Sequence, residues 1–96
     1  MRSIDMTPDT KPKISARARI DTDALTGKPI LLYPEGVLIL NPTGHAIVAL
    51  CSGDSSIDEI IASLAKRYQV EPAKIEPEVM QYLARLQAKN LLETSS

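Results

Sequence analysis

The fold is decided by the stretch Ile30-Leu31-Leu32-Tyr33-Pro34-Glu35-Gly36-Val37-Leu38-Ile39-Leu40, in which two apolar runs flank a turn sequence. Pro34 presets φ at the second position of a four-residue turn, and Gly36 relaxes the fourth position. The stretch therefore predicts an antiparallel hairpin with strands at 30–33 and 37–40. Neither run alternates as a strand with one solvated face should. We therefore expect helices to cover one face, and a partner to cover the other face or the strand edge.

An alternating segment precedes the hairpin. Its apolar positions are every second residue: Ile14, Ala16, Ala18 and Ile20. Arg17 and Arg19 lie between them. Period two predicts a half-buried strand with a basic outer face. A loop follows at 21–28, so the three strands are expected to form an antiparallel meander. The first twelve residues show no periodicity and are expected to be a flexible arm.

Two helix starts follow the hairpin. Asn41 is a favoured N-cap and Pro42 suits the first helical position, so the sequence predicts a helix from 42 to about 51. Ser56 and Glu59 form the capping box Ser-x-x-Glu, which starts a second helix. The apolar residues of this helix recur at helical spacing and predict one buried stripe: Ile57, Ile60, Ile61, Leu64, Ala65 and Tyr68.

Two prolines bear on the third helix. Because Pro77 inside a helix would remove a backbone hydrogen bond, we expect a short turn at 72–75 and a helix start near Glu76 or Pro77. The helix is expected to run to Lys89, with Asn90 as a left-handed residue after its end. The order of elements predicts an α+β, winged helix-turn-helix-like fold, a three-stranded antiparallel sheet followed by three α-helices. One domain is expected at 13–93, with an arm at 1–12 and a tail at 94–96.

Composition excludes several classes of protein. The chain has 96 residues, 11 basic and 12 acidic, and a net charge of −1. This charge does not form the basic field of a nucleic-acid-binding domain. No apolar run approaches the roughly 20 residues of a membrane span, and the N-terminus lacks the apolar region of a signal peptide. The single cysteine, Cys51, cannot close an internal disulfide. A soluble, cytoplasmic protein is expected, with no nucleic acid or membrane as partner.

The sequence offers no convergent set of catalytic or metal-binding residues. His45 is the only histidine, and it is expected at the surface or half-buried. Cys51 has apolar neighbours, which favours a buried structural thiol over a nucleophile. The glycines are isolated, so no phosphate loop is present. We therefore expect a binding module, with no metal, no cofactor and no enzymatic activity.

The third helix carries more apolar residues than a core needs. A stripe of about 100° suffices for the core, and it is formed by Ile75, Val79, Tyr82, Leu83 and Leu86. Met80, Ala84 and Leu91, with Gln87 between them, widen this arc. Three interpretations are open: ordinary packing within a small domain, a face for a partner, or a homodimer interface.

The ordered motifs resemble the PQQ (pyrroloquinoline quinone) biosynthesis protein D family over about residues 13–93. The resemblance rests on Leu31-Leu32-Tyr33-Pro34-Glu35-Gly36, Leu40-Asn41, Leu50-Cys51-Ser52-Gly53, Ser56-Ile57-Asp58-Glu59-Ile60, Lys66-Arg67-Tyr68 and Lys89-Asn90-Leu91-Leu92-Glu93. Gly44-His45 and Pro77 depart from the family pattern. The resemblance implies a peptide chaperone, a recognition element for a ribosomally made and modified peptide. It would present the PQQ precursor peptide to a radical S-adenosylmethionine (SAM) enzyme, which cross-links a Glu and a Tyr of the peptide.

The resemblance also implies where the peptide binds. Related modules add the peptide as a strand on their third strand and pack it against the third helix. Carried onto this sequence, the site comprises Val37, Leu38, Ile39, Leu40, Met80, Leu83, Ala84, Gln87 and Leu91. The enzyme needs a second surface, either Arg17 and Arg19 or Lys66 and Arg67. The alternatives are a recognition module for another modified-peptide pathway and a winged-helix DNA-binding regulator.

Overall fold

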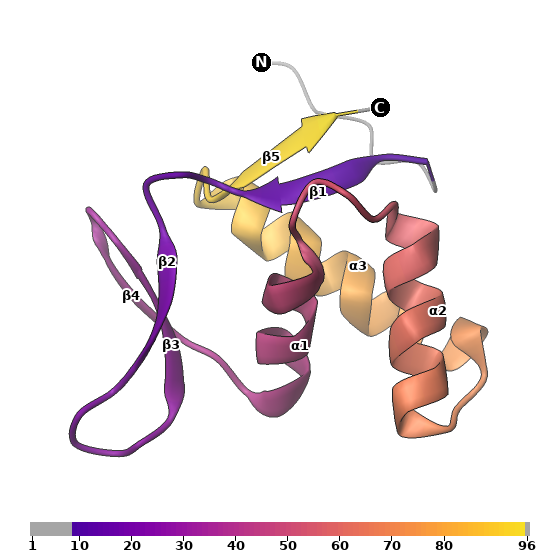
Figure 1. The fold of residues 1–96 in the computed structure, drawn as a ribbon, viewed down its shortest axis with the longest axis horizontal. Coiled ribbons are helices and arrows are strands. Elements are labelled where there is room, and N and C mark those ends of the chain that lie inside the picture. The colour runs from indigo at the N-terminus through magenta and orange to yellow at the C-terminus, as the bar shows by residue number, and fades with distance from the viewer. Residues whose placement is uncertain (1–8, 96) are drawn as a thin grey trace.

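The structure is a computed structural model that describes residues 9–95 (Figure 1). Its elements are β1 (Lys11–Ile14), β2 (Arg19–Thr22), β3 (Pro29–Tyr33), β4 (Gly36–Ile39), α1 (Pro42–Leu50), α2 (Ile57–Tyr68), α3 (Pro72–Ala88) and β5 (Leu92–Ser95). The α+β class and the order of a three-stranded antiparallel sheet followed by three helices are confirmed. The structure adds a second, two-stranded sheet made by β1 and β5.

The three-stranded sheet has the order β2-β3-β4. Leu31 pairs with Leu38 across the predicted hairpin, and Tyr33 pairs with Gly36 at its turn. Ile20 pairs with Leu31 on the other side of β3. In Figure 1 this sheet stands to one side of the helices, and α1 follows directly from β4.

The single strand predicted from Ile14 to Ile20 is wrong, because the chain turns there. The Ala18 N–H donates to the Ser15 carbonyl at 3.0 Å, and the Arg17 N–H donates to the Ser15 hydroxyl at 3.3 Å. This turn separates β1 from β2, which belong to different sheets. Local alternation could not reveal it, since the partner of β1 lies about 80 residues further along the chain.

The β1–β5 sheet extends across both expected domain boundaries. Ile14 pairs with Leu92 and Lys11 pairs with Ser95, so β1 begins inside the expected arm and β5 extends into the expected tail. Pro12 is fully buried, which holds this segment on the domain. Residues 1–8 of the expected arm and residue 96 of the tail lie outside the described residues. Of the remaining arm residues, 9 and 10 lead into β1, and 11 and 12 are its first two residues.

The predicted caps of the first two helices are confirmed. The Asn41 side chain accepts a hydrogen bond from the Gly44 N–H at 2.6 Å. At α2, the Glu59 N–H donates to the Ser56 hydroxyl at 3.1 Å, and the Ser56 N–H donates to the Glu59 carboxylate at 2.8 Å. The predicted stripe of α2 is buried as far as Ala65, whereas Tyr68 remains 38% exposed.

The predicted start of the third helix is wrong, because α3 begins at Pro72 and continues through Pro77. Ile75 and Val79 are buried four residues apart, so packing holds the helix across the proline. Ala73, whose carbonyl loses its helical donor at Pro77, is exposed and can be hydrated. The left-handed residue after the helix is confirmed, with φ 59° at Asn90.

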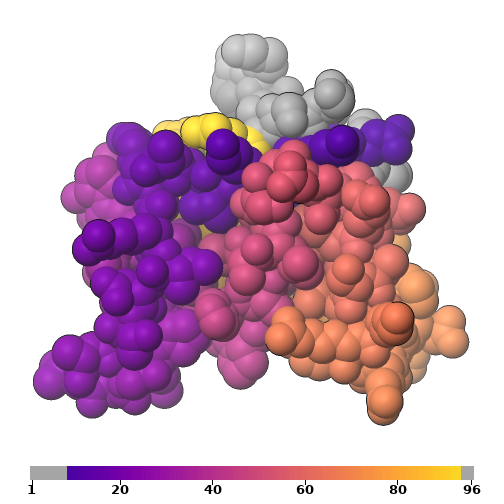
Figure 2. Space-filling view, viewed as in Figure 1, coloured from indigo at the N-terminus to yellow at the C-terminus, as the bar shows by residue number. Residues whose placement is uncertain are grey.

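One core joins the helices to the inner face of the sheet. Fully buried side chains come from β3, α1, α2, α3 and the segment after α3: Leu31, Ile47, Ile60, Leu64, Leu83, Leu86 and Leu91. Leu91 and Leu92 also pack onto this core. In the space-filling view, α1 lies between the three-stranded sheet on one side and α2 on the other (Figure 2).

Candidate functional site

The outer edge of β4 is free of any strand in the part of the chain that the structure describes. The Leu40 N–H donates to the Pro29 carbonyl at 3.0 Å, which makes these two residues a hydrogen-bonded pair. Hydrogen-bonded and non-hydrogen-bonded pairs alternate along an antiparallel ladder. The N–H and C=O groups of Val37 and Ile39 therefore point away from β3, toward the free edge.

The side chains of β4 alternate, although the sequence does not. Leu38 and Leu40 are buried against the core. Val37 is 53% exposed and Ile39 is 64% exposed. The sequence predicts that a partner covers the second face or the edge of this strand. In the free protein the face that carries Val37 and Ile39 is exposed. Val37 and Ile39 offer an added strand both their backbone groups and apolar side chains.

One hollow lies between the C-terminal end of β4 and α3, and a second lies between the β3–β4 turn and the end of α3. The hollow at the C-terminal end, here called the Ile39 hollow, is lined by Lys28, Pro29, Ile39, Leu40, Asn41, Pro42, Tyr82 and Arg85. The hollow beside the β3–β4 turn, here called the hairpin hollow, is lined by Arg17, Tyr33, Glu35, Ala88, Lys89 and Asn90. The C-terminal end of β4 thus lies near Tyr82 and Arg85, and the turn before β4 lies near Ala88 at the end of α3. Strand and helix therefore run in opposite directions.

The residues of α3 that line these hollows are not those of the site expected from the sequence. Leu83 and Leu91 are fully buried, and Met80 and Gln87 are half-buried. Ala84 is exposed. At 100° per residue, Met80 and Gln87 point about 140° to 160° away from Arg85 around the helix. They do not line either hollow.

Tyr82 and Arg85 are residues of α3 that sequence reasoning did not assign to the site. Both line the Ile39 hollow and a neighbouring hollow formed with Lys74, Pro77, Glu78 and Gln81. Burial raises the pKa of the Tyr82 phenol, and the nearby Arg85 guanidinium opposes that rise. The spacing Lys74, Glu78, Gln81, Arg85 follows one helical face, which is the signal that could have identified this flank.

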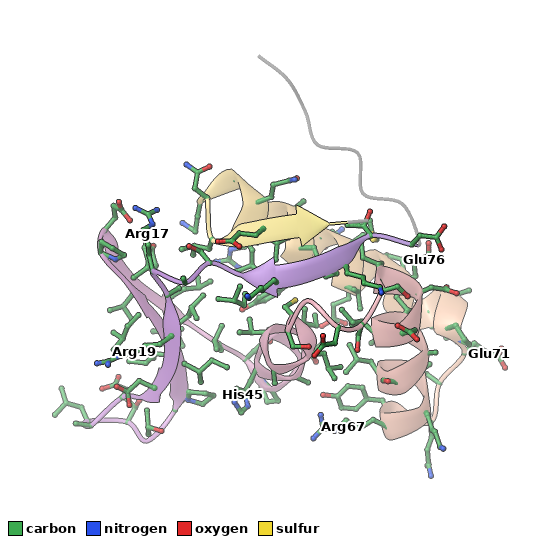
Figure 3. The ribbon with its side chains drawn as sticks, turned by 45° about the horizontal axis from the view of Figure 1, so that its top comes forward. Arg17, Arg19, His45, Arg67, Glu71 and Glu76 are labelled. Atoms are coloured by element: carbon green, nitrogen blue, oxygen red, sulfur yellow. The ribbon has the colours of Figure 1, made fainter. Side chains whose placement is uncertain are left out.

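The basic residues proposed from the sequence as an enzyme-binding surface fall into two separate places. Arg17 and Arg19 lie on the sheet side of the molecule, and Arg67 lies at the far side beside α2 (Figure 3). Arg17 pairs with Glu35 at 3.7 Å, and Arg19 pairs with Asp21 at 3.9 Å. Lys66 and Arg67 are exposed in the last turn of α2.

The residues considered for chemistry do not form a reactive pair. Cys51 is 3% exposed, and burial raises the pKa of its thiol to about 12. His45 is exposed on α1, as predicted. Residues 9–95 contain no group of three or more His, Cys, Asp or Glu side chains placed to hold a metal ion. Over the same residues, no helix is long and apolar enough to cross a membrane.

Comparison with known proteins agrees with this architecture. A relative from Methylococcus capsulatus, named PqqA binding protein, is 32% identical over 80 residues, covering 83% of this chain and 84% of the relative. The bifunctional coenzyme PQQ synthesis protein C/D of Methylorubrum extorquens is 30% identical over 82 residues, covering 85% of this chain and 22% of that longer protein.

Two solved structures are also similar. One is the solution structure of the PqqD truncation of Methylobacterium extorquens PqqCD, described as a functional and stand-alone recognition element for ribosomally synthesized and modified peptides. It has a TM-score of 0.77 and 29% identity, and the match covers 93% of this chain and 95% of that one. The other, the crystal structure of PqqD from Xanthomonas campestris, has a TM-score of 0.59 and 26% identity, with 97% and 99% coverage. The family model "Coenzyme PQQ synthesis protein D (PqqD)" matches residues 30–92, which include β4 and α3. The chain belongs to the coenzyme PQQ synthesis protein D family.

Proposed function

We propose that the chain is a non-catalytic peptide chaperone of PQQ biosynthesis. In this role it binds the precursor peptide and presents it to the radical SAM enzyme that cross-links a Glu and a Tyr of the peptide. Membership of the PqqD family supports this role, as do relatives named PqqA binding protein. The buried, protonated thiol of Cys51 supports the non-catalytic part of the proposal.

The observation that carries the proposal is the free edge of β4. An added strand would exchange backbone hydrogen bonds with Val37 and Ile39, while the two exposed side chains contact alternate residues of the peptide. Leu38 and Leu40 would hold the strand in place from the core side, since their side chains are buried. The peptide would then lie between β4 and the α3 flank that carries Tyr82 and Arg85.

The remaining residues of the sequence-derived site define a second face of α3. Met80, Ala84 and Gln87 lie there, with Leu83 and Leu91 buried beneath. An Ala84→Arg variant tests this face, because Ala84 is exposed and a long side chain there can be solvated. Weakened peptide binding would assign the second face to the site, and unchanged binding would restrict the site to the Arg85 flank.

The enzyme would contact one of the two separate basic surfaces. The double variants Arg17→Glu/Arg19→Glu and Lys66→Glu/Arg67→Glu make the same change in charge at the two places. The pair that abolishes co-purification with the radical SAM enzyme, while the peptide still binds, identifies the enzyme surface. If neither pair weakens co-purification, both assignments are wrong.

The experiment that tests peptide binding is a backbone amide titration of ¹⁵N-labelled protein with synthetic PqqA. We expect shifts at Val37 and Ile39 and slower hydrogen exchange of their amides, because they would become ladder donors. Ile20 and Thr22 provide the matched control, since they lie on the opposite free edge of the sheet, at β2. Shifts confined to α2, with β4 unchanged, would refute the proposed site.

A second copy of this chain could occupy the same edge, so the oligomeric state belongs in the same experiment. Sedimentation of the free protein separates the two occupants. A monomer that forms a one-to-one complex with the peptide supports the chaperone model. A homodimer that the peptide does not dissociate would assign the edge of β4 to self-association instead.

A further inference from the structure

The charges around the proposed groove differ from those of the whole chain. The Ile39 hollow and its neighbour hold three basic residues, Lys28, Lys74 and Arg85, and one acidic residue, Glu78. The hairpin hollow holds Arg17 and Lys89 with Glu35. The chain as a whole has a net charge of −1. Basic side chains are thus concentrated along the free edge of a protein that is slightly acidic overall.

The two ends of the groove are not equivalent. In the hairpin hollow, Arg17 already has a carboxylate partner, because it pairs with Glu35 at 3.7 Å. No ion pair in residues 9–95 involves Arg85 or Lys74. Arg85 is exposed, and its guanidinium lies near the buried Tyr82 phenol. An anionic group would therefore gain more from the Ile39 end than from the hairpin end.

We propose that the peptide bound on β4 carries an acidic side chain where it passes Arg85, just beyond Ile39, and that this contact fixes the direction of the added strand. The inference rests on the peptide-binding function proposed above. A guanidinium binds a carboxylate through two parallel hydrogen bonds, which gives the contact directional specificity. A strand added antiparallel to β4 would begin at the Ile39 hollow, because β4 ends there. Its acidic residue would therefore precede, in the peptide sequence, the apolar residues that contact β4.

A peptide fits this surface better than a nucleic acid. The free edge of β4 presents the outward N–H and C=O groups of Val37 and Ile39, and the side chains of these residues are apolar. A strand with alternating side chains satisfies both features. A phosphate backbone would satisfy only the basic residues, and its binding grows with the number of cations it neutralises.

The test measures the affinity of synthetic PqqA from Methylococcus capsulatus, the organism of one relative named PqqA binding protein, by fluorescence anisotropy. Each acidic residue of the peptide is replaced in turn by its amide. We expect Arg85→Glu to raise Kd by about 10- to 100-fold, the range of a charge-assisted hydrogen bond. Arg67→Glu is the matched control, since it makes the same change in charge on the far side of the molecule (Figure 3).

The contact predicts a specific coupling between protein and peptide. One amide-substituted peptide should bind the unmodified protein more weakly than the original peptide does, by a similar factor. That peptide and the original should bind the Arg85→Gln variant with equal affinity, because the contact is already absent there. If Arg85→Glu leaves Kd within about twofold, or if every amide-substituted peptide binds as well as the original, the acidic contact is refuted while the chaperone function stands. If the unmodified protein does not bind the peptide at all, the proposed function fails, and the inference fails with it. Binding of a DNA duplex that Arg85→Glu abolishes, without peptide binding, would assign the groove to nucleic acid instead.

Discussion

Gly44 of α1 lies directly against the side chain of Tyr82 of α3, so that a methyl group on Gly44 would overlap the phenol ring. The ring carbons Cζ and Cε2 of Tyr82 would lie 2.5 and 2.6 Å from that methyl group. The Tyr82 hydroxyl is buried and has no hydrogen-bond partner in residues 9–95. Because Tyr82 also lines the Ile39 hollow, the close approach of α1 and α3 at Gly44 fixes the position of a side chain in the proposed site.

Gly44→Ala should therefore destabilise the protein. Helix propensity alone would stabilise α1 by up to about 1 kcal/mol, because alanine replaces glycine inside a helix. The overlap with a buried ring costs about 1 to 3 kcal/mol and should exceed that gain. The free energy of unfolding, measured in urea, is expected to fall.

Gly36→Ala is the matched control for this change, since the nearest side-chain atom to an added methyl group there is 3.5 Å away. A second control is Gly44→Ala in a Tyr82→Leu background, where the destabilisation should disappear. If Gly44→Ala raises the free energy of unfolding in the unmodified background, the Tyr82 ring moves aside at little cost, and the packing argument is wrong.

The free edge of β4 gives a prediction about backbone groups. Proline at position 39 removes the outward N–H that an added strand would use, and edge strands tolerate proline where this N–H faces solvent. We expect Ile39→Pro to abolish peptide binding and Ile39→Thr to weaken it by a smaller factor, since threonine keeps the N–H. Both are measured by the anisotropy titration, with circular dichroism to verify folding.

Ile20→Pro is the matched control, because Ile20 is also an exposed isoleucine whose N–H points away from β3, at the β2 edge. It should bind the peptide as the unmodified protein does. Equal loss of binding in the folded Ile20→Pro and Ile39→Pro variants would show that proline acts through the sheet as a whole.

The burial of Cys51 predicts how stability depends on pH. The thiol has an ordinary pKa of 9.0 in the unfolded chain, and burial raises the pKa to about 12 in the folded protein. The folded state therefore holds the proton more tightly, and this contribution is fully present below pH 9 and is lost as the pH rises from 9 toward 12. Between pH 8 and pH 10 the free energy of unfolding should fall by about 1.4 kcal/mol from this group.

The measurement compares the unmodified protein with Cys51→Ala in urea at each pH. Lysines and tyrosines titrate in both proteins, so only the difference between the two curves reports on the thiol. The cost of the smaller side chain is the same at every pH. Two curves that run parallel from pH 8 to pH 10 would contradict the burial of a protonated thiol at Cys51.

The hairpin and the first two helices could be predicted because their signals are local. The Pro34–Gly36 turn, the Asn41 cap and the capping box at Ser56 each lie within a few residues of the element that they define. The β1–β5 sheet could not be predicted, since it joins segments about 80 residues apart and alternation does not name a partner. The turn at Ser15 was missed for the same reason.

The candidate site was only half accessible to sequence reasoning. Leu38 and Ile39 look equally apolar in sequence, and only the register with β3 decides that Leu38 is buried and Ile39 is exposed. On α3, periodicity separates a core stripe from the two flanks beside it, but it does not say which flank faces the sheet. That choice depends on how α3 packs against α1 and β4, so the sequence predicts Met80 at the site, whereas Arg85 lines the Ile39 hollow.

The two prolines of α3 give the last prediction. Pro72 is the first residue of the helix, where its missing N–H has no helical acceptor. Pro77 lies inside the helix, and its missing N–H leaves the Ala73 carbonyl without a helical donor.

Pro77→Ala should raise the free energy of unfolding by about 1 to 2 kcal/mol, since the gain in helix propensity exceeds the added entropy of the unfolded chain. Pro72→Ala, the matched control, should change it by less than about 0.5 kcal/mol or lower it slightly. Urea unfolding of both variants decides between the two helix starts. If Pro77→Ala gives no more stability than Pro72→Ala, the helix begins near Pro77, as the sequence alone suggests, and residues 72–76 are not held in α3.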